Sequence, residues 1–339
     1  MQQSSGAVRT RIVLDAMGGD YAPEQTVKGA VEAVNSSDEI RVILVGKQDM
    51  IAKELEKYEY AKEDIEVVHA SEIIDMGDVP TVAIKDKKDS SLVVAMRLVR
   101  EGKADALVSA GSTGAVLVGG QLVVGRLKGI KRPPLAPFIP TTKGFSLLID
   151  CGANVDARPE HLVQFAQMGS IYYENVMGKK NPTVALLNIG TEEEKGNQLV
   201  KDTKPLMKEC KNINYIGSVE ARELVSGAAD VIVCEAFVGN VVLKFFEGLA
   251  LTLFGSLKEG LMSSTRTKLG ALLVKPALKG LKNQFDTSSQ GGAPLLGLKG
   301  LVVKAHGNSS SKEIEIALKQ CISFKKQKIN EKIKESICD

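Results

Sequence analysis

The chain has 339 residues, of which 44% are hydrophobic and 25% are charged, enough apolar content for a substantial core in one or two domains. Its 44 basic and 41 acidic residues leave a net charge of only +3, which argues against a nucleic-acid-binding protein. The five cysteines are scattered and include no CxxC pair, so we expect neither a disulfide framework nor a zinc site. The same cysteine usage is typical of a protein in the reducing cytoplasm.

The sequence also argues against a secreted protein and against a membrane-spanning one. Residues 1–10 lack the apolar core of a signal peptide, and we expect them to form a disordered leader. No uninterrupted apolar run approaches the roughly 20 residues of a membrane span, so we expect no spanning helix. From residue 11 to residue 339 neither a linker nor a tandem repeat is visible, which predicts a single domain.

Short β-rich runs alternate with helical patterns along this domain. The expected strands cover residues 11–16, 41–46, 65–70, 106–110, 145–150, 183–189, 213–218, 231–236 and 301–306. Helical patterns are clearest over residues 24–34, 92–102 and 159–176. Several strands are apolar almost throughout, as is typical of strands covered on both faces, so the alternation predicts an α/β fold with a doubly wound, mostly parallel sheet.

Glycine-rich and polar breaks recur where an expected strand passes into a helix. They read DAMGGD (15–20), SAGSTG (109–114), DCGANVDARPEH (150–161), NIGTEEEKGN (188–197), EAFVGN (235–240) and KAHGNSS (304–310). Parallel strands place such loops at one edge of the sheet, where open α/β folds bind ligands. Six such loops at one edge of the sheet predict a ligand-binding site there.

The segment SAGSTG has two interpretations. Gly111 allows a turn, and Ser112 or Thr113 can cap the following helix. The same turn can also direct backbone N–H groups and hydroxyls at an anion such as phosphate. It is neither a Walker loop nor a dinucleotide fingerprint, so by itself it favours the cap.

Other polar residues at these breaks leave alternatives open as well. Lys195 follows three glutamates and either belongs to a solvated charge cluster or polarises a carbonyl or phosphate. Asn240 either caps the helix that follows it or donates to an anion. Asp15 and Asp20 either cap a turn or orient a donor, and their spacing is not a metal signature.

Nucleophilic catalysis by a side chain is not supported by the residues present. The three histidines are not spaced for a Ser-His-Asp triad. Cys151 and Cys234 end two expected strands, but no neighbouring His or Lys would activate either thiol. We therefore interpret both cysteines as packing residues.

Together, these motifs resemble the bacterial phosphate acyltransferases, the acyl-acyl-carrier-protein:phosphate acyltransferases of fatty acid and phospholipid synthesis. The matching segments lie between about residues 11 and 320 and include LDAMGGDYAPE, SAGSTGA, GANVDARPEHLVQFAQMGS, LLNIGTEEEKGN, FVGNVVLKFFEG and LLGLKGLVVKAHG. Two motifs depart from the family pattern: Ser112 stands where the family has Asn, and Glu235-Ala236 stands where it has Asp-Gly.

The resemblance implies a fold, an assembly and a reaction. The fold would be a three-layer α/β/α sandwich like those of phosphotransacetylase and isocitrate dehydrogenase, with a protruding helical hairpin, in a homodimer. Acyl-acyl carrier protein and inorganic phosphate would give acyl phosphate and free carrier, without a metal or cofactor, and the product would supply a glycerol-3-phosphate acyltransferase. An acyl-CoA-dependent phosphotransacetylase and a catalytically silent scaffold for lipid synthesis are the alternatives.

The resemblance also assigns residues. It places Lys195 and Asn240 at the catalytic centre, and our hypothesis is that they offset charge on the thioester carbonyl oxygen while SAGSTG holds phosphate. The residues expected to contact phosphate or the acyl thioester are Asp15, Gly18, Gly19, Asp20, Ser109, Gly111, Ser112, Thr113, Gly114, Asn154, Gly239 and His306.

Two basic segments are candidates for interaction surfaces. Lys85, Lys87 and Lys88 either form a solvated loop or dock the acidic carrier protein. Residues 257–283, in an expected hairpin over 250–285, hold six basic residues and one acidic residue beside an apolar stripe, and we expect Pro276 to divide them into two helices. They either pack a dimer or bind anionic lipid at the inner face of the cytoplasmic membrane, with contacts at Lys268, Leu272, Leu273 and Lys275.

Overall fold

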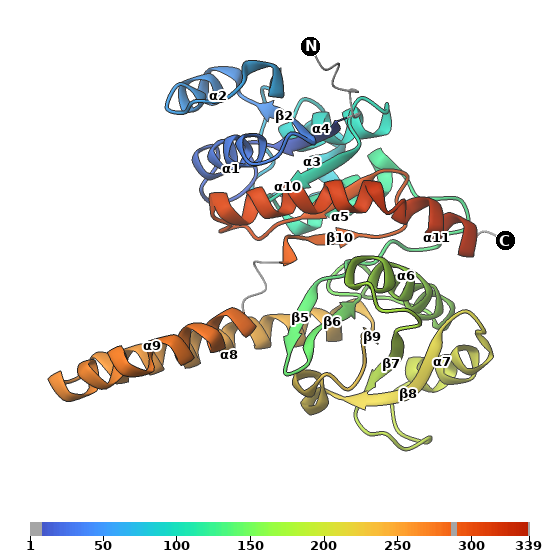
Figure 1. The fold of residues 1–339 in the computed structure, drawn as a ribbon. Coiled ribbons are helices and arrows are strands. Elements are labelled where there is room, and N and C mark those ends of the chain that lie inside the picture. The colour runs from blue at the N-terminus through green and yellow to red at the C-terminus, as the bar shows by residue number, and fades with distance from the viewer. Residues whose placement is uncertain (1–8, 286–289, 338–339) are drawn as a thin grey trace, which may run out of the picture. The chain divides into compact units, whose positions relative to one another are not determined.

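A computed structural model describes residues 9–285 and 290–337, and it divides the chain into two compact units (Figure 1). Unit 1 comprises residues 1–136, 174–178 and 288–339, and unit 2 comprises residues 137–173 and 179–287. The single domain expected over residues 11–339 is thus resolved into two units, each with its own sheet. The leader expected over residues 1–10 lies outside the described residues up to residue 8, and the first strand begins at Thr10.

Unit 1 is built on a six-stranded sheet in the order β10-β11-β4-β1-β2-β3. The strands are β1 (Thr10–Asp15), β2 (Ile40–Gly46), β3 (Ile65–His69), β4 (Ala106–Ser109), β10 (Ala293–Leu295) and β11 (Leu301–Lys304). All pairs are parallel except β10 with β11. The central strands are buried almost throughout, as their apolar sequences predict.

Helices cover this sheet on both faces. They are α1 (Glu24–Asn35), α2 (Gln48–Leu55), α3 (Pro80–Asp86), α4 (Ser91–Arg100), α5 (Thr113–Gly119), α10 (Ser311–Lys326) and α11 (Ile329–Ile337), with short turns η1 (Lys62–Asp64) and η2 (Gly120–Val124). The chain runs from β1 through β2 to β3 in one direction and then crosses to β4 on the other side of β1. Right-handed crossovers therefore place α1 and α4 on opposite faces, and the strand order reverses between β1 and β4.

Unit 2 has a five-stranded sheet in the order β5-β6-β9-β7-β8. Its strands are β5 (Phe138–Thr141), β6 (Gly144–Ile149), β7 (Thr183–Asn188), β8 (Asn214–Glu220) and β9 (Val231–Val233), and only β5 is antiparallel to its neighbour. Its helices are α6 (Pro159–Met177), α7 (Gln198–Glu209), η3 (Ala221–Ser226), α8 (Ala236–Met262) and α9 (Thr265–Phe285). The carboxyl ends of β6, β9 and β7 lie side by side at one edge.

The predicted α/β class and mostly parallel pairing are confirmed, and all nine expected strands are present. The sequence analysis missed β5 and β10, because short antiparallel edge strands leave little periodic signal. The strand expected over 231–236 ends at Val233, because Glu235 caps a helix that already begins at Ala236.

The expected hairpin is formed by α8 and α9, which extend away from the sheet of unit 2 as the orange helices of Figure 1. It begins earlier than residue 250, because α8 is continuous from Ala236. The expectation that Pro276 divides the second arm was wrong: α9 continues through Pro276. Proline removes one helical hydrogen bond, to the carbonyl of Leu272, and Pro276 is exposed, so water can reach that carbonyl.

The sequence shows no uninterrupted apolar run of membrane-spanning length, but a test of helix length and mean composition gives a candidate. In the described part of the chain α8 meets that test by length and composition, and only 6% of its apolar window is buried. Lys244 and Glu247 interrupt the apolar run in the sequence, but on the helix they form an ion pair at 2.7 Å. Length and composition alone do not distinguish a span from a helix that packs elsewhere.

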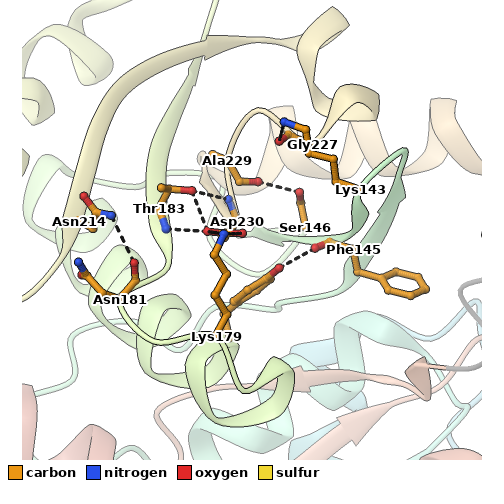
Figure 2. A network of polar contacts seen from close by, with 11 residues as sticks. Lys143, Phe145, Ser146, Lys179, Asn181, Thr183, Asn214, Gly227, Ala229 and Asp230 are labelled. Atoms are coloured by element: carbon orange, nitrogen blue, oxygen red, sulfur yellow. Dashed lines mark hydrogen bonds and ion pairs between the residues drawn. The ribbon is translucent and has the colours of Figure 1, made fainter.

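A polar network ties together the amino ends of the strands in unit 2 (Figure 2). Asp230 Oδ2, just before β9, accepts hydrogen bonds from the backbone N–H and the hydroxyl of Thr183, each at 2.8 Å, and its two carboxylate oxygens lie 2.7 Å from Lys179 Nζ. Burial alone would raise the pKa of Asp230, but Lys179 and Thr183 bring this pKa below its ordinary value. The network therefore favours an ionised Asp230 in the folded state.

We expect Asp230→Asn to lower the free energy of unfolding by about 1–3 kcal/mol at pH 7, because the charged acceptor is lost. The folded-state pKa of Asp230 is depressed. Its contribution is therefore complete above the unfolded-state pKa of about 3.9, and it is lost as the pH falls through the folded-state pKa. Urea unfolding at neutral pH and at about pH 2 measures the difference. Asp156→Asn, at an exposed carboxylate, is the control, and a gap of equal size at both pH values would contradict the assignment.

Candidate active site

Polar residues of unit 1 meet where the strand order reverses between β1 and β4. Asp15 ends β1 and Ser109 ends β4, and the Ser109 hydroxyl donates to Asp15 Oδ2 at 2.8 Å. The same hydroxyl oxygen accepts from the backbone N–H of Gly111 at 3.1 Å. In doubly wound folds, ligands bind in the crevice at such a reversal, so this is the expected ligand edge of unit 1.

The loops at this edge approach each other too closely for side chains. A Cβ on Gly18 would lie 2.8 Å from the backbone N of Gly111 and 2.5 Å from Asp15 Oδ2. Gly19 has a φ of +107°, and a Cβ there would lie 2.9 Å from the carbonyl oxygen of Gly307. The structure thus brings together Gly18, Gly19 and Gly111, which the sequence analysis assigned to substrate binding, and adds Gly307.

Two buried ionisable side chains, Asp15 and Lys304, contact these loops. Asp15 is 2% exposed, and burial raises its pKa although hydrogen bonds from Ser91 and Ser109 and the charge of Lys304 oppose the rise. Lys304, at the end of β11, is also buried, and its ammonium contacts the carbonyl of Ala110 at 3.4 Å. Asp15 therefore holds the loops together, whereas Asp20 is exposed beside them. Sequence reasoning missed Lys304, a charged residue that ends an otherwise apolar strand.

The helix-cap interpretation of SAGSTG is confirmed. The Ser112 hydroxyl accepts from the backbone N–H of Ala115 at 3.5 Å, and α5 begins at Thr113. Gly114 packs against the ring of Pro80 at the start of α3, where a Cβ would lie 2.6 Å from Pro80 Cγ. His306 is exposed just after β11. Phosphate binding by this loop stays a prediction.

In unit 2 the loop after β6 is organised by a buried carboxylate that sequence reasoning missed. Asp150 Oδ2 accepts from the side-chain amide of Asn154 at 2.7 Å, and Oδ1 accepts from the backbone N–H of Ala153 at 3.2 Å. The carbonyl of Asn154 accepts from the backbone N–H of Ala236 at 3.2 Å. Asn154 is thus a buried link between the loop after β6 and the start of α8.

Asn240 does not cap its helix, contrary to one of the two interpretations of the sequence. Glu235 is the N-cap of α8, and its carboxylate accepts from the N–H groups of Phe237 and Val238 at 2.6 and 2.9 Å. Asn240 lies one turn further on, exposed, with its Oδ1 3.6 Å from the Cβ position at Gly152. Its side chain is therefore available to a ligand.

The departure at Ala236 is accommodated without strain. Ala236 is fully buried and is the first residue of α8. Gly239, one turn later, is the position that requires glycine, since a Cβ there would lie 1.9 Å from the carbonyl oxygen of Asp150. The backbone of α8 therefore packs directly against the loop after β6.

The third loop of this edge, after β7, carries Lys195 with an exposed side chain. Asn188, the last residue of β7, donates its side-chain amide to the carbonyls of Gly190 and Lys195 at 2.9 and 3.1 Å. Gly196 has a φ of +117°, and a Cβ there would lie 2.7 Å from Asn188 Oδ1. Because β9 lies between β6 and β7, Lys195 and Asn240 belong to the same edge of one sheet.

The cysteine side chains are unsuited to nucleophilic catalysis. Cys151 and Cys234 are buried, and burial raises the pKa of both thiols well above its ordinary value. The thiolate is the reactive form of cysteine, so neither residue is an activated nucleophile at neutral pH.

Of the three lysines considered for carrier docking, Lys87 is engaged within the chain. Its ammonium lies 2.6 Å from Asp78 Oδ2 and donates to the carbonyl of Ile73 at 2.8 Å. Lys85 and Lys88 are exposed. The candidate docking cations are therefore two rather than three.

The comparisons with known proteins agree on one family. Residues 10–332 match the model of the fatty acid synthesis protein family. The phosphate acyltransferase of Alkaliphilus oremlandii is 55% identical over 327 residues, which are 96% of this chain and 97% of that protein. The phosphate acyltransferase of Clostridium novyi is 49% identical over 96% of this chain and 98% of that protein.

Solved structures of lower sequence identity share the fold. A phosphotransacetylase from Streptococcus pyogenes superposes with a TM-score of 0.64 at 18% identity and covers 93% of both chains. The EutD phosphotransacetylase from Staphylococcus aureus has a TM-score of 0.59 at 18% identity, over 94% of both chains. The expected similarity to the phosphotransacetylase fold is confirmed.

We expect Gly239→Ala to destabilise the chain by about 1–3 kcal/mol or more, because the added methyl group overlaps the Asp150 carbonyl and forces the start of α8 away. Gly248→Ala is the matched control, since it lies on the same helix with nothing within 4 Å of its Cβ position. Alanine there should stabilise the helix by about 1 kcal/mol. Thermal unfolding of both variants measures the contrast, and equal effects would contradict the packing described.

Proposed function

Because the chain belongs to the fatty acid synthesis protein family, with relatives at 47–55% identity named phosphate acyltransferase, we propose that it transfers an acyl group from acyl carrier protein to inorganic phosphate. As a member of this family the chain is an acyltransferase. The observation that carries the proposal is this identity over about 96% of the chain, joined to exposed Lys195 and Asn240 at one sheet edge.

The proposed chemistry needs no side-chain nucleophile. A phosphate oxygen attacks the thioester carbonyl carbon, and a tetrahedral intermediate forms with negative charge on the former carbonyl oxygen. The carbon–sulfur bond then breaks, the acyl phosphate is released, and the thiolate of the carrier takes up a proton. The buried thiols of Cys151 and Cys234 are consistent with such direct attack.

Stabilisation of the intermediate falls to residues of unit 2 in this proposal. The Lys195 ammonium and the Asn240 amide are exposed donors, and each interaction aimed at a developing oxyanion typically contributes about 3 kcal/mol to catalysis. In unit 1 the SAGSTG loop holds phosphate through its N–H groups and the hydroxyls of Ser112 and Thr113. Asp15 and Ser109 support this loop from the buried side.

The acyl donor separates the proposal from its alternatives. An enzyme of the phosphotransacetylase type would use acyl-CoA, whereas the family name and the exposed Lys85 and Lys88 favour an acidic carrier protein. These lysines lie at the end of α3 and just beyond it, and α3 packs against α5. A catalytically silent scaffold is disfavoured, because Ala236 fits its helix start without strain and Ser112 keeps a capping hydroxyl.

We expect Lys195→Ala to lower the rate of acyl phosphate formation by about 10²–10³-fold with the fold intact, because a donor to the oxyanion is lost. The assay supplies acyl-acyl carrier protein and phosphate, with acyl-CoA as the alternative donor, and circular dichroism checks folding. Lys201→Ala, at an exposed lysine on α7, is the control and should keep full activity. Near-normal turnover of Lys195→Ala would contradict the role of Lys195, and faster turnover of acyl-CoA would favour the alternative enzyme.

The proposal extends to the hairpin, which we infer to attach a homodimer to the inner face of the cytoplasmic membrane. Leu272 and Leu273 are 66% and 84% exposed, and Lys268 and Lys275 lie exposed on the same helix. Large apolar side chains beside basic ones are typical of helices that lie in the headgroup layer. Each lysine near an anionic surface contributes about 1 kcal/mol, and a dimer would present two copies.

Membrane attachment suits the proposed product. An acyl phosphate is reactive and carries an apolar chain, so delivery at the membrane to a glycerol-3-phosphate acyltransferase would shorten its exposure to water. The exposed apolar side chains of both helices supply the contact area: Phe245, Leu249, Leu251, Leu253, Leu257, Met262, Leu269, Leu272, Leu273, Val274 and Leu281.

We expect the wild-type protein to sediment with phosphatidylglycerol vesicles at low salt and not with phosphatidylcholine vesicles, because binding needs anionic headgroups. Leu272→Glu combined with Leu273→Glu should abolish binding while light scattering still reports a dimer. Leu206→Glu, at a partly exposed leucine of α7, is the control. Loss of the dimer with vesicle binding retained would assign the hairpin to dimer packing instead.

A further inference from the structure

A buried lysine lies beneath the loop that carries Lys195. Lys204 is on α7, and it is 3% exposed, whereas Lys201 and Lys208 on the same helix are exposed. Its ammonium donates to the carbonyls of Glu192, Glu193 and Lys195 at 3.0, 2.8 and 3.1 Å. All three N–H bonds of the ammonium are thereby used on the backbone of a single loop.

Asn188, at the end of β7, is the second side chain that donates to the carbonyls of this loop. Its amide donates to the carbonyls of Gly190 and Lys195, so two side chains together hold four loop carbonyls, those of Gly190, Glu192, Glu193 and Lys195. Leaving a buried ammonium without partners would be costly, so the loop and Lys204 stabilise each other. The backbone of residues 190–196 is consequently held in one conformation.

The inward carbonyls decide where the N–H groups of the loop point. In a trans peptide the C=O and the following N–H are on opposite sides, and the cis peptides of the described residues lie elsewhere, before Pro23 and Asp150. The N–H groups of Thr191, Glu193, Glu194 and Gly196 therefore face away from Lys204 and Asn188. None of these four donors has a partner among residues 9–285 and 290–337.

The charges around the loop suit a carbonyl oxygen that becomes negative in the transition state better than they suit a bound phosphate dianion. Lys195 adds an exposed ammonium to the outward N–H groups, but three glutamates precede it. Of these glutamates, Glu193 forms an ion pair with Lys208 at 2.7 Å. These carboxylates disfavour a permanent phosphate charge, whereas the N–H groups can still donate to a carbonyl oxygen whose charge appears only in the transition state.

We propose that Lys204 is the positioning residue of this loop: with Asn188 it turns the loop carbonyls inward, so that the outward N–H groups and Lys195 together meet the thioester carbonyl oxygen. This rests on the role proposed above for Lys195. Lys204 itself touches no substrate in this account. It acts through the backbone, and small displacements of donors are known to cost about 10²-fold in rate.

Steady-state kinetics of the full-length protein with acyl-acyl carrier protein and phosphate test the proposal. Lys204→Met should lower kcat about 10–100-fold, with KM for both substrates changed less than about 3-fold, because the donors matter only in the transition state. Asn188→Ala, which removes the side-chain donor to the Gly190 carbonyl and one of the two donors to the Lys195 carbonyl, should act in the same direction. Lys201→Met, at an exposed lysine on the same helix, is the matched control and should keep kcat.

A double-mutant cycle separates positioning from a general structural role. In a Lys195→Ala background, Lys204→Met should cost less than it does in the wild type, because the ammonium that the loop positions is already absent and only the N–H donors remain to be displaced. Thermal unfolding checks each variant, and Asn188→Ala carries the test if Lys204→Met does not fold. Unchanged kcat in folded variants, or losses that multiply in the double variant, would overturn this proposal alone. A wild-type protein without phosphate-dependent thioester cleavage would overturn the proposed function as well.

Discussion

Close contact between backbones at the carboxyl ends of the parallel strands is the constraint on which both candidate ligand edges depend. In unit 1 the turn after β1 lies against the turn after β4, with no room for a Cβ on Gly18. In unit 2 the first turn of α8 lies against the loop after β6, and Gly239 leaves even less space beside the Asp150 carbonyl. Where two backbones touch, only glycine fits, and the polar groups of separate loops are brought within reach of one ligand.

The side chains that hold these loops differ from those that would meet a substrate. Asp15, Lys204 and Lys304 are buried: Asp15 Oδ2 accepts a hydrogen bond from the Ser109 hydroxyl, and the two ammonium groups contact backbone carbonyls. Lys195 and Asn240 are exposed. A buried ammonium is tolerated where its hydrogen bonds are made, as they are for Lys204, and a group bound in this way has a fixed position. Rigid loops of this kind hold their donors in place before the reaction, which reduces reorganisation in the transition state.

The helix α8 connects two features that the sequence presents separately. Its first turns pack on the core of unit 2 through Val238 and Val242 and carry Asn240. Beyond them the same helix leaves the core and becomes an exposed apolar surface up to Met262. One continuous helix therefore joins the proposed catalytic amide to the proposed membrane contact, an arrangement suited to an apolar product.

The sequence by itself determined the class of fold, the positions of the parallel strands, the polar loops at their carboxyl ends, and Lys195 and Asn240 as candidates. These follow from local signals, namely apolar periodicity and glycine-rich turns. The tertiary structure alone decided the division into two sheets, the cap at Glu235 in place of Asn240, and the buried positions of Lys204 and Lys304. Lys204 sits in an ordinary amphipathic helix, and its three carbonyl partners lie 9 to 12 residues away across a loop. Such contacts depend on how the chain closes on itself, and no periodicity in the sequence records them.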